Sequence, residues 1–327
     1  MSATQASAPG KIILFGEHAV VYGQPALAVP VTQVQATATL TPLSPSPTGR
    51  EGRSEGIWID ARDVGRRYRL EDAPPDDPLA AAIRLTFANL QLPISNYVLQ
   101  ITLTSSIPIA SGLGSGAAVC TALVRALANY LNHPLTNAEV SSIVFETEKL
   151  LHGTPSGIDN TVIAYGQPVY FVKGQSPIPF NVARPFQLLI ADTGLPSPTK
   201  ITVGDVRAAR EKEPERYEQM FRAIGDIARE ARTLIEIGQT PGARFAETLG
   251  ALMSCNHALL QQLGASCPEL DVLAECARAA GAAGAKLSGG GRGGNMLALV
   301  TPETESAVRA GLEVAGAKRV IGTVVGE

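Results

Sequence analysis

The sequence predicts an α+β fold divided into two domains, and three observations support this. The chain has 327 residues, which exceeds the roughly 250 to 300 residues at which a single hydrophobic core stops growing. Alternating apolar residues, typical of strands, dominate the first part of the chain, whereas longer helical patterns mixed with strands follow. We therefore expect an N-terminal domain over residues 1–190 and a C-terminal domain over residues 191–327.

Strands are predicted in the first part of the chain from a period of two. Val34, Ala36, Ala38 and Leu40 alternate with polar residues, so one side of this segment faces a core. Two segments rich in Pro, Ser, Gly and charge, Thr41–Gly56 and Glu71–Pro78, are expected to be loops. The predicted strands are Lys11–Phe15, Ala26–Leu40, Ile57–Ile59, Tyr68–Leu70 and Tyr97–Thr104.

Helices are predicted where the apolar period changes to about 3.6 residues. After Gly116, residues four apart form one apolar stripe from Val119 to Leu131. A second helix follows His133, because Thr136 and Glu139 have the spacing of a capping box. Glu148 lies on the apolar line of this second helix, and a carboxylate on a buried face needs a partner such as a cation or a metal.

The later part of the chain predicts a mixture of helices and strands. The expected strands are Val169–Val172, Gln187–Ala191, Met296–Val300 and Arg319–Val325. The expected helices are one or two over Ile201–Gly238, then 241–263, 268–281 and Glu303–Ala315.

Composition excludes several classes of function. The net charge is −3 with no long run of either sign, so neither nucleic acid nor an anionic membrane is an expected partner. The chain has no run of 18 apolar residues and no segment typical of a signal peptide. Four widely spaced cysteines and four histidines form no zinc motif. We expect a cytoplasmic protein with buried, reduced thiols.

The strongest local feature is a glycine-rich loop that leads directly into the predicted helix. Glycines let the backbone approach a phosphate closely, and a helix N-terminus adds partial positive charge. A plain turn before a helix is the simpler interpretation, but three glycines and two serines favour phosphate binding. The residues expected to hold the nucleotide are Pro108, Ser111, Gly112, Leu113, Gly114, Ser115, Gly116, Ala117 and Ala118.

Other nucleotide-binding designs match this loop less well. Gly112, Gly114 and Ala117 have the spacing of a dinucleotide fingerprint, but Ser105–Ser111 separates them from the preceding strand, which that fingerprint does not allow. The chain contains no Walker A motif and neither of the protein-kinase motifs His-Arg-Asp and Asp-Phe-Gly. A nucleoside triphosphate is therefore favoured over a nicotinamide cofactor.

Two further segments carry charged residues beside apolar runs. In 9–23 (PGKIILFGEHAVVYG), Lys11 precedes an apolar strand and Glu17 with His18 follows it; a buried strand with solvated ends is the simpler interpretation. In 148–160 (EKLLHGTPSGIDN), Asp159 follows a turn rich in Gly and Pro. Stabilisation of that turn by the Asp159 side chain is the simpler interpretation.

These segments, together with 286–294 (KLSGGGRGG), resemble in order and spacing the signature blocks of the GHMP small-molecule kinase superfamily. The first block is most similar to members that phosphorylate mevalonate. The resemblance implies a two-domain GHMP kinase fold, in which the N-terminal domain is like ribosomal protein S5 domain 2 and the C-terminal domain is ferredoxin-like. It also implies a homodimer.

The resemblance assigns roles to individual residues. Asp159 corresponds to the catalytic base, Lys11 to a residue next to the accepting hydroxyl, and Glu148 to a magnesium ligand. A second loop serine that often contacts the metal is replaced by Gly116, so either Ser115 or a water molecule is expected to serve instead. Glu17, His18, Ser156 and Thr199 correspond to positions near the substrate. These roles suit phosphoryl transfer, which needs a proton acceptor, a positive charge and hard oxygen ligands for Mg²⁺.

The expected reaction is transfer of the γ-phosphate of ATP, with Mg²⁺, to the primary hydroxyl of mevalonate, giving 5-phosphomevalonate in isoprenoid biosynthesis. A related kinase acting on phosphomevalonate, a sugar or homoserine is the nearest alternative. A non-catalytic ligand sensor on the same fold is another, although the joint presence of Lys11, Glu148 and Asp159 argues against it.

Overall fold

The computed structural model describes residues 3–43, 56–109, 111–153, 155–238 and 242–326. Its contacts divide the chain into two compact units. Unit 1 comprises 1–10, 34–108 and 114–166, and unit 2 comprises 11–33, 109–113 and 167–327. The units interleave along the chain, so they give no single boundary with which the predicted division at 190/191 can be compared.

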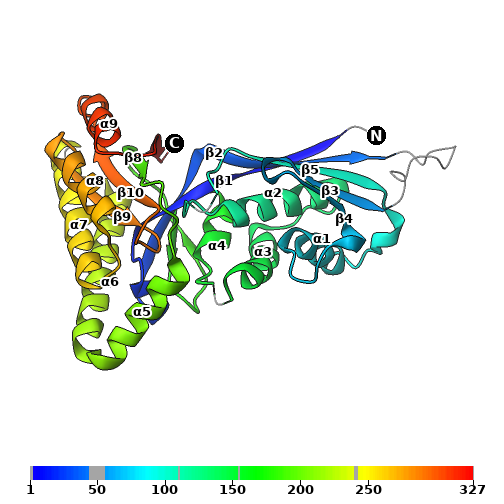
Figure 1. The fold of residues 1–327 in the computed structure, drawn as a ribbon, viewed down its shortest axis with the longest axis horizontal. Helices are drawn as coiled ribbons and strands as arrows, with labels where there is room; N and C mark the ends of the chain where they lie inside the picture. Colours follow the sequence, from blue (N-terminus) through cyan, green and yellow to red (C-terminus); the bar gives the residue numbers. More distant parts are fainter. Residues whose placement is uncertain (1–2, 44–55, 110, 154, 239–241, 327) are drawn as a thin grey trace. The chain divides into compact units, whose positions relative to one another are not determined.

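Unit 1 combines a mixed sheet with a group of helices (Figure 1). Strand β5 pairs antiparallel with the second half of β2 and parallel with β3, which in turn pairs antiparallel with β4. The helices α1, α2, α3 and α4 pack on one another, and α2 contacts β5. The elements are β3 (Ile57–Ala61), η2 (Arg62–Val64), β4 (Arg66–Arg69), η3 (Leu70–Asp72), α1 (Pro78–Asn89), η4 (Ile94–Asn96), β5 (Leu99–Ser105), α2 (Ser115–Tyr130), α3 (Asn137–His152) and α4 (Ile158–Tyr165).

Two long strands contribute residues to both units. These are β1 (Thr4–Phe15) and β2 (Ala26–Pro42), which pair with each other. In unit 2 the first residues of β2 pair antiparallel with β6 (Val169–Phe171), and β6 pairs with the short β7 (Ile178–Pro179). The turn η1 (Ala19–Tyr22) lies between β1 and β2 in the sequence and packs against α6 of the same unit.

Unit 2 is built on a four-stranded antiparallel sheet with the order β11-β8-β10-β9. Helices α7, α8 and α9 pack against its strands (Figure 1). The elements are β8 (Phe186–Asp192), α5 (Thr199–Lys212), α6 (Pro214–Ile237), α7 (Gly242–Gln262), α8 (Pro268–Ala279), β9 (Gly284–Ser288), β10 (Asn295–Val300), α9 (Glu305–Val314) and β11 (Arg319–Val325).

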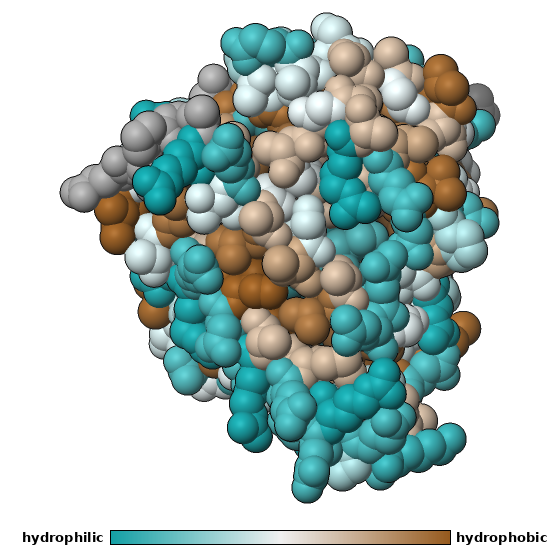
Figure 2. All heavy atoms as spheres, turned by 90° about the vertical axis from the view of Figure 1, so that its left-hand side faces the viewer, coloured by the Kyte–Doolittle hydropathy of each residue, from teal (hydrophilic) through white to brown (hydrophobic). Residues whose placement is uncertain are grey.

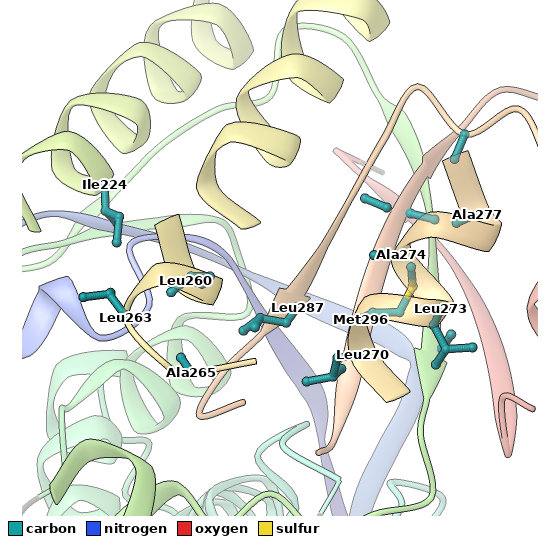
Figure 3. Close-up of a cluster of buried hydrophobic side chains, with 14 of the residues drawn as sticks. Ile224, Leu260, Leu263, Ala265, Leu270, Leu273, Ala274, Ala277, Leu287 and Met296 are labelled. Carbon is teal, nitrogen blue, oxygen red and sulfur yellow. The ribbon is translucent and has the colours of Figure 1, made fainter. Parts of the chain in front are cut away.

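The core of unit 2 joins its helices to its sheet. Apolar side chains from α6, α7 and α8 form one buried cluster with Leu287 of β9 and Met296 of β10 (Figure 3). At Gly250 of α7, a Cβ would lie 2.1 Å from the carbonyl oxygen of Ala283, so only glycine allows the helix to approach β9 this closely. This packing fixes β9 and the glycine-rich segment that follows it.

The surface of the unit 2 helices is mainly hydrophilic, with hydrophobic side chains between the polar ones (Figure 2). Large exposed apolar residues occur on α5, α6, α8 and α9, at Ile201, Ile237, Val272 and Val314. Within the described ranges, none of the helices combines the length and apolar composition that crossing a bilayer requires.

Most predicted elements are present, and the exceptions are informative. The capping box is confirmed, since the Thr136 hydroxyl accepts from the Glu139 N–H and the Glu139 carboxylate accepts from the Thr136 N–H. Helices α1 and α4 and strand β9 were not predicted, and most of the loop predicted over 41–56 lies outside the described residues. All four cysteines are free, but the prediction of buried thiols is confirmed only for Cys120: Cys255 on α7 is exposed, and Cys267 and Cys276 are partly exposed.

Candidate functional site

The second part of the glycine-rich loop forms the start of α2 in unit 1. Gly114 is the N-cap residue and has a φ of 74°, a conformation that favours glycine. Because Gly114 has no side chain, it cannot cap the first turn of α2, which begins at Ser115. Ser115 and Gly116 are partly exposed, whereas Ala117 and Ala118 are buried. The first turn of α2 therefore presents backbone N–H groups that could bind phosphate oxygens.

Glu148 lies against this first turn. It is buried on α3, as its place on the apolar line predicted. A Cβ added at Gly116 would lie 3.5 Å from Oε1 of Glu148 and 3.2 Å from Cδ1 of Leu151. The structure therefore brings together two of the predicted site residues, the loop glycine and the carboxylate. An ion bound to Glu148 would be close to phosphates held by the start of α2.

Asp159 lies in the first turn of α4, which packs against α3. The N-cap residue Gly157 has a φ of 92°, and the Ser156 hydroxyl accepts a 3.3 Å hydrogen bond from the Ile158 N–H. The side chain of Asn160 donates to the carbonyl oxygen and the hydroxyl of Ser141 on α3, at 3.1 and 2.9 Å. Asp159 is partly exposed, and the Asn160 hydrogen bonds anchor the helix that carries it to α3.

In unit 2, Lys11 and the first part of the glycine-rich loop form a second group. The Lys11 ammonium donates to the Gly112 carbonyl at 2.9 Å, and the Lys11 N–H donates to the Leu113 carbonyl at 3.0 Å. The Asn295 side chain of β10 donates to the Ser111 carbonyl at 2.5 Å. Lys11 is buried, and its ammonium lies next to the loop. Pro108 belongs to unit 1 and is partly buried.

The segment after β1 has an unusual backbone. Gly16 has a φ of 96°, and a Cβ there would lie 2.4 Å from the Pro25 carbonyl oxygen. His18 has a φ of 59° and a ψ of −48°, which is rare for a residue with a side chain. Such strain persists only where surrounding contacts enforce it, and it is common at functional sites.

The imidazole of His18 is buried and neutral near neutral pH. Its Nε2 lies 3.0 Å from the Gly290 carbonyl oxygen. Since a carbonyl can only accept, Nε2 carries the proton and Nδ1 is left as an acceptor. Burial lowers the pKa of His18 to about 4; the Gly290 hydrogen bond opposes this shift and the charge of Arg292 adds to it.

Thr199 lies next to the same glycine-rich segment. It is the first residue of α5, and a Cβ at Gly290 would be 2.3 Å from its hydroxyl oxygen. The Ser197 hydroxyl donates to the Gly291 carbonyl at 2.9 Å. The structure therefore brings His18 and Thr199 to the same loop of unit 2, with Thr199 exposed.

Glu17 has partners that the sequence did not indicate. Lys286 of β9 forms an ion pair with Oε1 of Glu17, and both side chains are fully buried. The Asn256 amide of α7 donates to Oε2 of Glu17 at 3.1 Å. Lys286 lies in the segment 286–294, which was singled out from the sequence. Its pairing with Glu17 could not be predicted, because the two residues are 269 positions apart in the sequence. A substrate contact for Glu17 stays a prediction.

The described residues contain no group of three or more His, Cys, Asp or Glu side chains that could hold a metal by themselves. Mg²⁺ bound with a nucleotide needs fewer protein ligands, because the phosphates and water supply the rest. A buried Glu148 beside the start of α2 suits such an ion, with the partly exposed Ser115 in the same turn as Gly116.

Comparison with known proteins identifies the family. The profile of the GHMP kinases N terminal domain matches residues 79–167, and that of the GHMP kinases C terminal matches residues 240–317. A mevalonate kinase of Thermococcus gammatolerans is 35% identical over 331 residues, which cover 97% of this chain and 94% of that protein. The chain belongs to the GHMP kinase family.

Other relatives extend this comparison. A mevalonate kinase of Pyrococcus furiosus is 34% identical over 334 residues, covering 97% of this GHMP kinase and 94% of the relative. The structure of the L. major mevalonate kinase in complex with R-mevalonate has a TM-score of 0.80 at 29% identity, over 98% of this chain and 95% of that one. The two-domain α+β fold predicted from the sequence is confirmed.

The two profiles divide the site residues of this GHMP kinase unevenly. The N-terminal profile includes the glycine-rich loop, Glu148 and Asp159, and the C-terminal profile includes the segment 286–294. Lys11, Glu17 and His18 precede both profiles, although the full-length relatives extend over nearly the whole chain. The individual roles of these residues stay predictions.

Proposed function

We propose that this GHMP kinase transfers the γ-phosphate of ATP to the primary hydroxyl of mevalonate, giving 5-phosphomevalonate in the mevalonate pathway of isoprenoid biosynthesis. The observation that carries the proposal is the start of α2, where an open helix N-terminus with a glycine N-cap lies beside the buried Glu148. Relatives named mevalonate kinase that match nearly the full chain support the choice of alcohol.

The residues of unit 1 are proposed to bind the nucleotide and to accept the proton. Backbone N–H groups around Gly114 and Ser115 bind the phosphates, because a helix N-terminus favours anions. Glu148 and the Ser115 hydroxyl would hold Mg²⁺, which neutralises phosphate charge when it is bound. Asp159 accepts the proton of the attacking hydroxyl, a task suited to a partly exposed carboxylate on an anchored helix.

The residues of unit 2 are proposed to bind the alcohol. The Lys11 ammonium stabilises the negative charge that develops on the hydroxyl oxygen. Neutral His18 can accept a hydrogen bond at Nδ1, because its Nε2 proton is directed at the Gly290 carbonyl. Thr199 offers an exposed hydroxyl, and Glu17 is the remaining unit 2 residue of the proposed substrate site. Ser156, which belongs to unit 1, completes the proposed set.

The surroundings of the enzyme are also part of the proposal. We place it in the cytoplasm as a homodimer whose partners are small molecules rather than nucleic acids or membranes. The net charge of −3 supports the part of this proposal that concerns nucleic acids and anionic membranes. Size measurement in solution tests the dimer.

ADP release in a coupled assay tests the reaction. Purified protein with Mg-ATP is given mevalonate, phosphomevalonate, galactose or homoserine in parallel, with a no-acceptor control. We expect ADP release above the control with mevalonate, and much less with the other alcohols. A higher kcat/KM for another alcohol would assign the enzyme to a sibling kinase, and no acceptor-dependent release with any of them would favour the sensor alternative.

A further inference from the structure

The ion pair of Glu17 and Lys286 is unusual because it is fully buried. Neither side chain is exposed, and the ammonium of Lys286 also donates to the Leu287 carbonyl at 2.6 Å. Burial lowers the pKa of Lys286, and the neighbouring Glu17 only partly opposes this shift. Each oxygen of the Glu17 carboxylate has its own donor: Oε1 accepts from Lys286 of β9, and Oε2 accepts from Asn256 of α7.

Stability alone does not explain this arrangement. The desolvation of two charges offsets most of their attraction, so apolar residues of similar volume in place of a buried pair are often equally stable or more stable. Exposed pairs on the same unit, such as Asp226 with Arg229 on α6, involve no such cost. Because the buried pair joins β9 to the segment just after β1, we infer that it holds this segment in a defined position.

The backbone conformation that needs such support is that of His18, the residue after Glu17. His18 has a φ of 59°, and its imidazole is buried against the Gly290 carbonyl. Its own carbonyl accepts from the Val21 N–H at 3.1 Å, and the Glu17 carbonyl accepts from the Ala19 N–H at 2.6 Å. These backbone contacts lie within one short turn, and the side chain of Glu17 ties this turn directly to β9 and α7.

We propose that Lys286 is a positioning residue: its ion pair with Glu17 holds His18 in the strained conformation that directs the imidazole to the Gly290 loop. This refines the role of Glu17 in the proposed substrate site: Glu17 acts through His18, because both of its carboxylate oxygens already accept hydrogen bonds from Lys286 and Asn256. The consequence for the reaction rests on the proposed function, in which His18 binds the alcohol. The geometric part does not depend on which alcohol is used.

Replacing both charges at once tests the proposal without leaving one buried charge unpaired. The variant Glu17→Leu/Lys286→Met keeps a similar volume, so it is expected to fold with a melting temperature near that of the wild type. NMR of histidine-labelled protein then follows the imidazole of His18, which is assigned by comparison with His18→Asn. The other charged groups near His18, Arg292 and its partner Asp205, are unchanged.

The wild-type His18 should titrate near pH 4. In the double variant we expect its pKa to rise by about one unit or more, as the ring gains solvent. The KM for mevalonate should rise about tenfold or more while the KM for Mg-ATP stays within about twofold, the pattern of a lost substrate contact. A folded double variant in which His18 still titrates near 4 and the mevalonate KM is unchanged overturns the proposal.

Two comparisons separate positioning from general destabilisation. Asp226→Leu/Arg229→Met removes an exposed pair from the same unit and should change neither the His18 titration nor either KM. In a His18→Asn background, the two buried substitutions should not raise the mevalonate KM further, because the residue they act through is gone. Additive increases would contradict the proposal. The NMR result needs no substrate, so failure of the proposed function leaves it interpretable.

Discussion

The site residues of the two units are held in different ways. In unit 1, Gly114, Ser115 and Asp159 lie at or next to the starts of α2 and α4 and are partly exposed. In unit 2, Glu17 and His18 are buried and are bound to segments more than 250 residues away in the sequence. Gly114, Ser115 and Asp159 thus depend on local helix geometry, whereas Glu17 and His18 depend on the tertiary fold. Substitutions of these three unit 1 residues should change activity with little loss of stability, whereas single substitutions of Glu17 or His18 should change both.

The largest expected effect in unit 1 comes from Gly114→Val. A β-branched side chain is disfavoured at a φ of 74° and would also occupy the space that the phosphates need. We expect ATP binding to be lost. Gly166→Val is the matched control, because Gly166 caps the end of α4 at a φ of 65° and has nothing within 4 Å of its added Cβ. Nucleotide titration and thermal unfolding are measured for both variants. Equal ATP affinity of the two folded variants would contradict the account.

Asp159→Asn tests the proton acceptor. The amide keeps the shape of the carboxylate but cannot take a proton, so kcat should fall at least ~10²-fold while ATP affinity and melting temperature hardly change. Steady-state kinetics with an ATP-binding measurement checks this. Near-normal turnover would mean that Asp159 serves only the start of α4.

Acid should destabilise unit 2 through His18. The pKa of His18 is about 4 in the folded protein and 6.5 in its ordinary state, so the unfolded chain binds more protons below pH 6.5. Stability therefore falls as the pH drops from about 6.5 to about 4, and the loss due to His18 at pH 5 is about 2 kcal/mol. Urea unfolding at pH 7 and pH 5 should show a smaller loss in His18→Asn. An identical loss in both proteins would exclude His18 as the source.

Glu148→Gln should weaken the use of magnesium. Loss of one carboxylate ligand is expected to raise the Mg²⁺ concentration needed for half-maximal activity by about tenfold, with a smaller effect on the maximal rate. A magnesium titration at fixed ATP measures this directly. Overlapping titration curves for the variant and the wild type would make Glu148 a structural carboxylate.

The smallest effect is expected for Gly116→Ser. An added Cβ would lie 3.2 Å from the end of the Leu151 side chain, which is exposed and can move, and 3.5 Å from the Glu148 carboxylate. If Ser115 already supplies the hydroxyl for the metal, turnover should stay within about twofold or fall slightly. A clear gain in turnover would show that the wild type lacks a metal ligand at this position.

Sequence patterns predicted most of the fold because their signals are local. The capping box at Thr136 and the apolar stripe of α2 lie within one element. Helix α4 was missed because Gly153, Pro155 and Gly157 indicate a turn just before it. Strand β9 was missed because all five of its residues are buried, so it has no alternation, and one of them is Lys286.

The site was predictable to the extent that it consists of contiguous motifs. The glycine-rich loop, Glu148 and Asp159 were all selected as candidates from short segments and their order, and their roles stay predictions. The tertiary contacts of the site were not predictable. The pairing of Glu17 with Lys286 and the contact of His18 with Gly290 depend on how β1, β9 and α7 come together, which no local pattern encodes.

The most direct test of the central claim is identification of the product. Protein, Mg-ATP and R-mevalonate are incubated, and the mixture is followed by phosphorus NMR. We predict a new phosphomonoester signal that grows with ADP and couples to the protons of a single methylene group, as phosphate on the primary hydroxyl requires. The signal should be absent with Asp159→Asn over the same time. No new phosphomonoester with the wild type, or one that forms faster from another alcohol of the panel, would contradict the assignment.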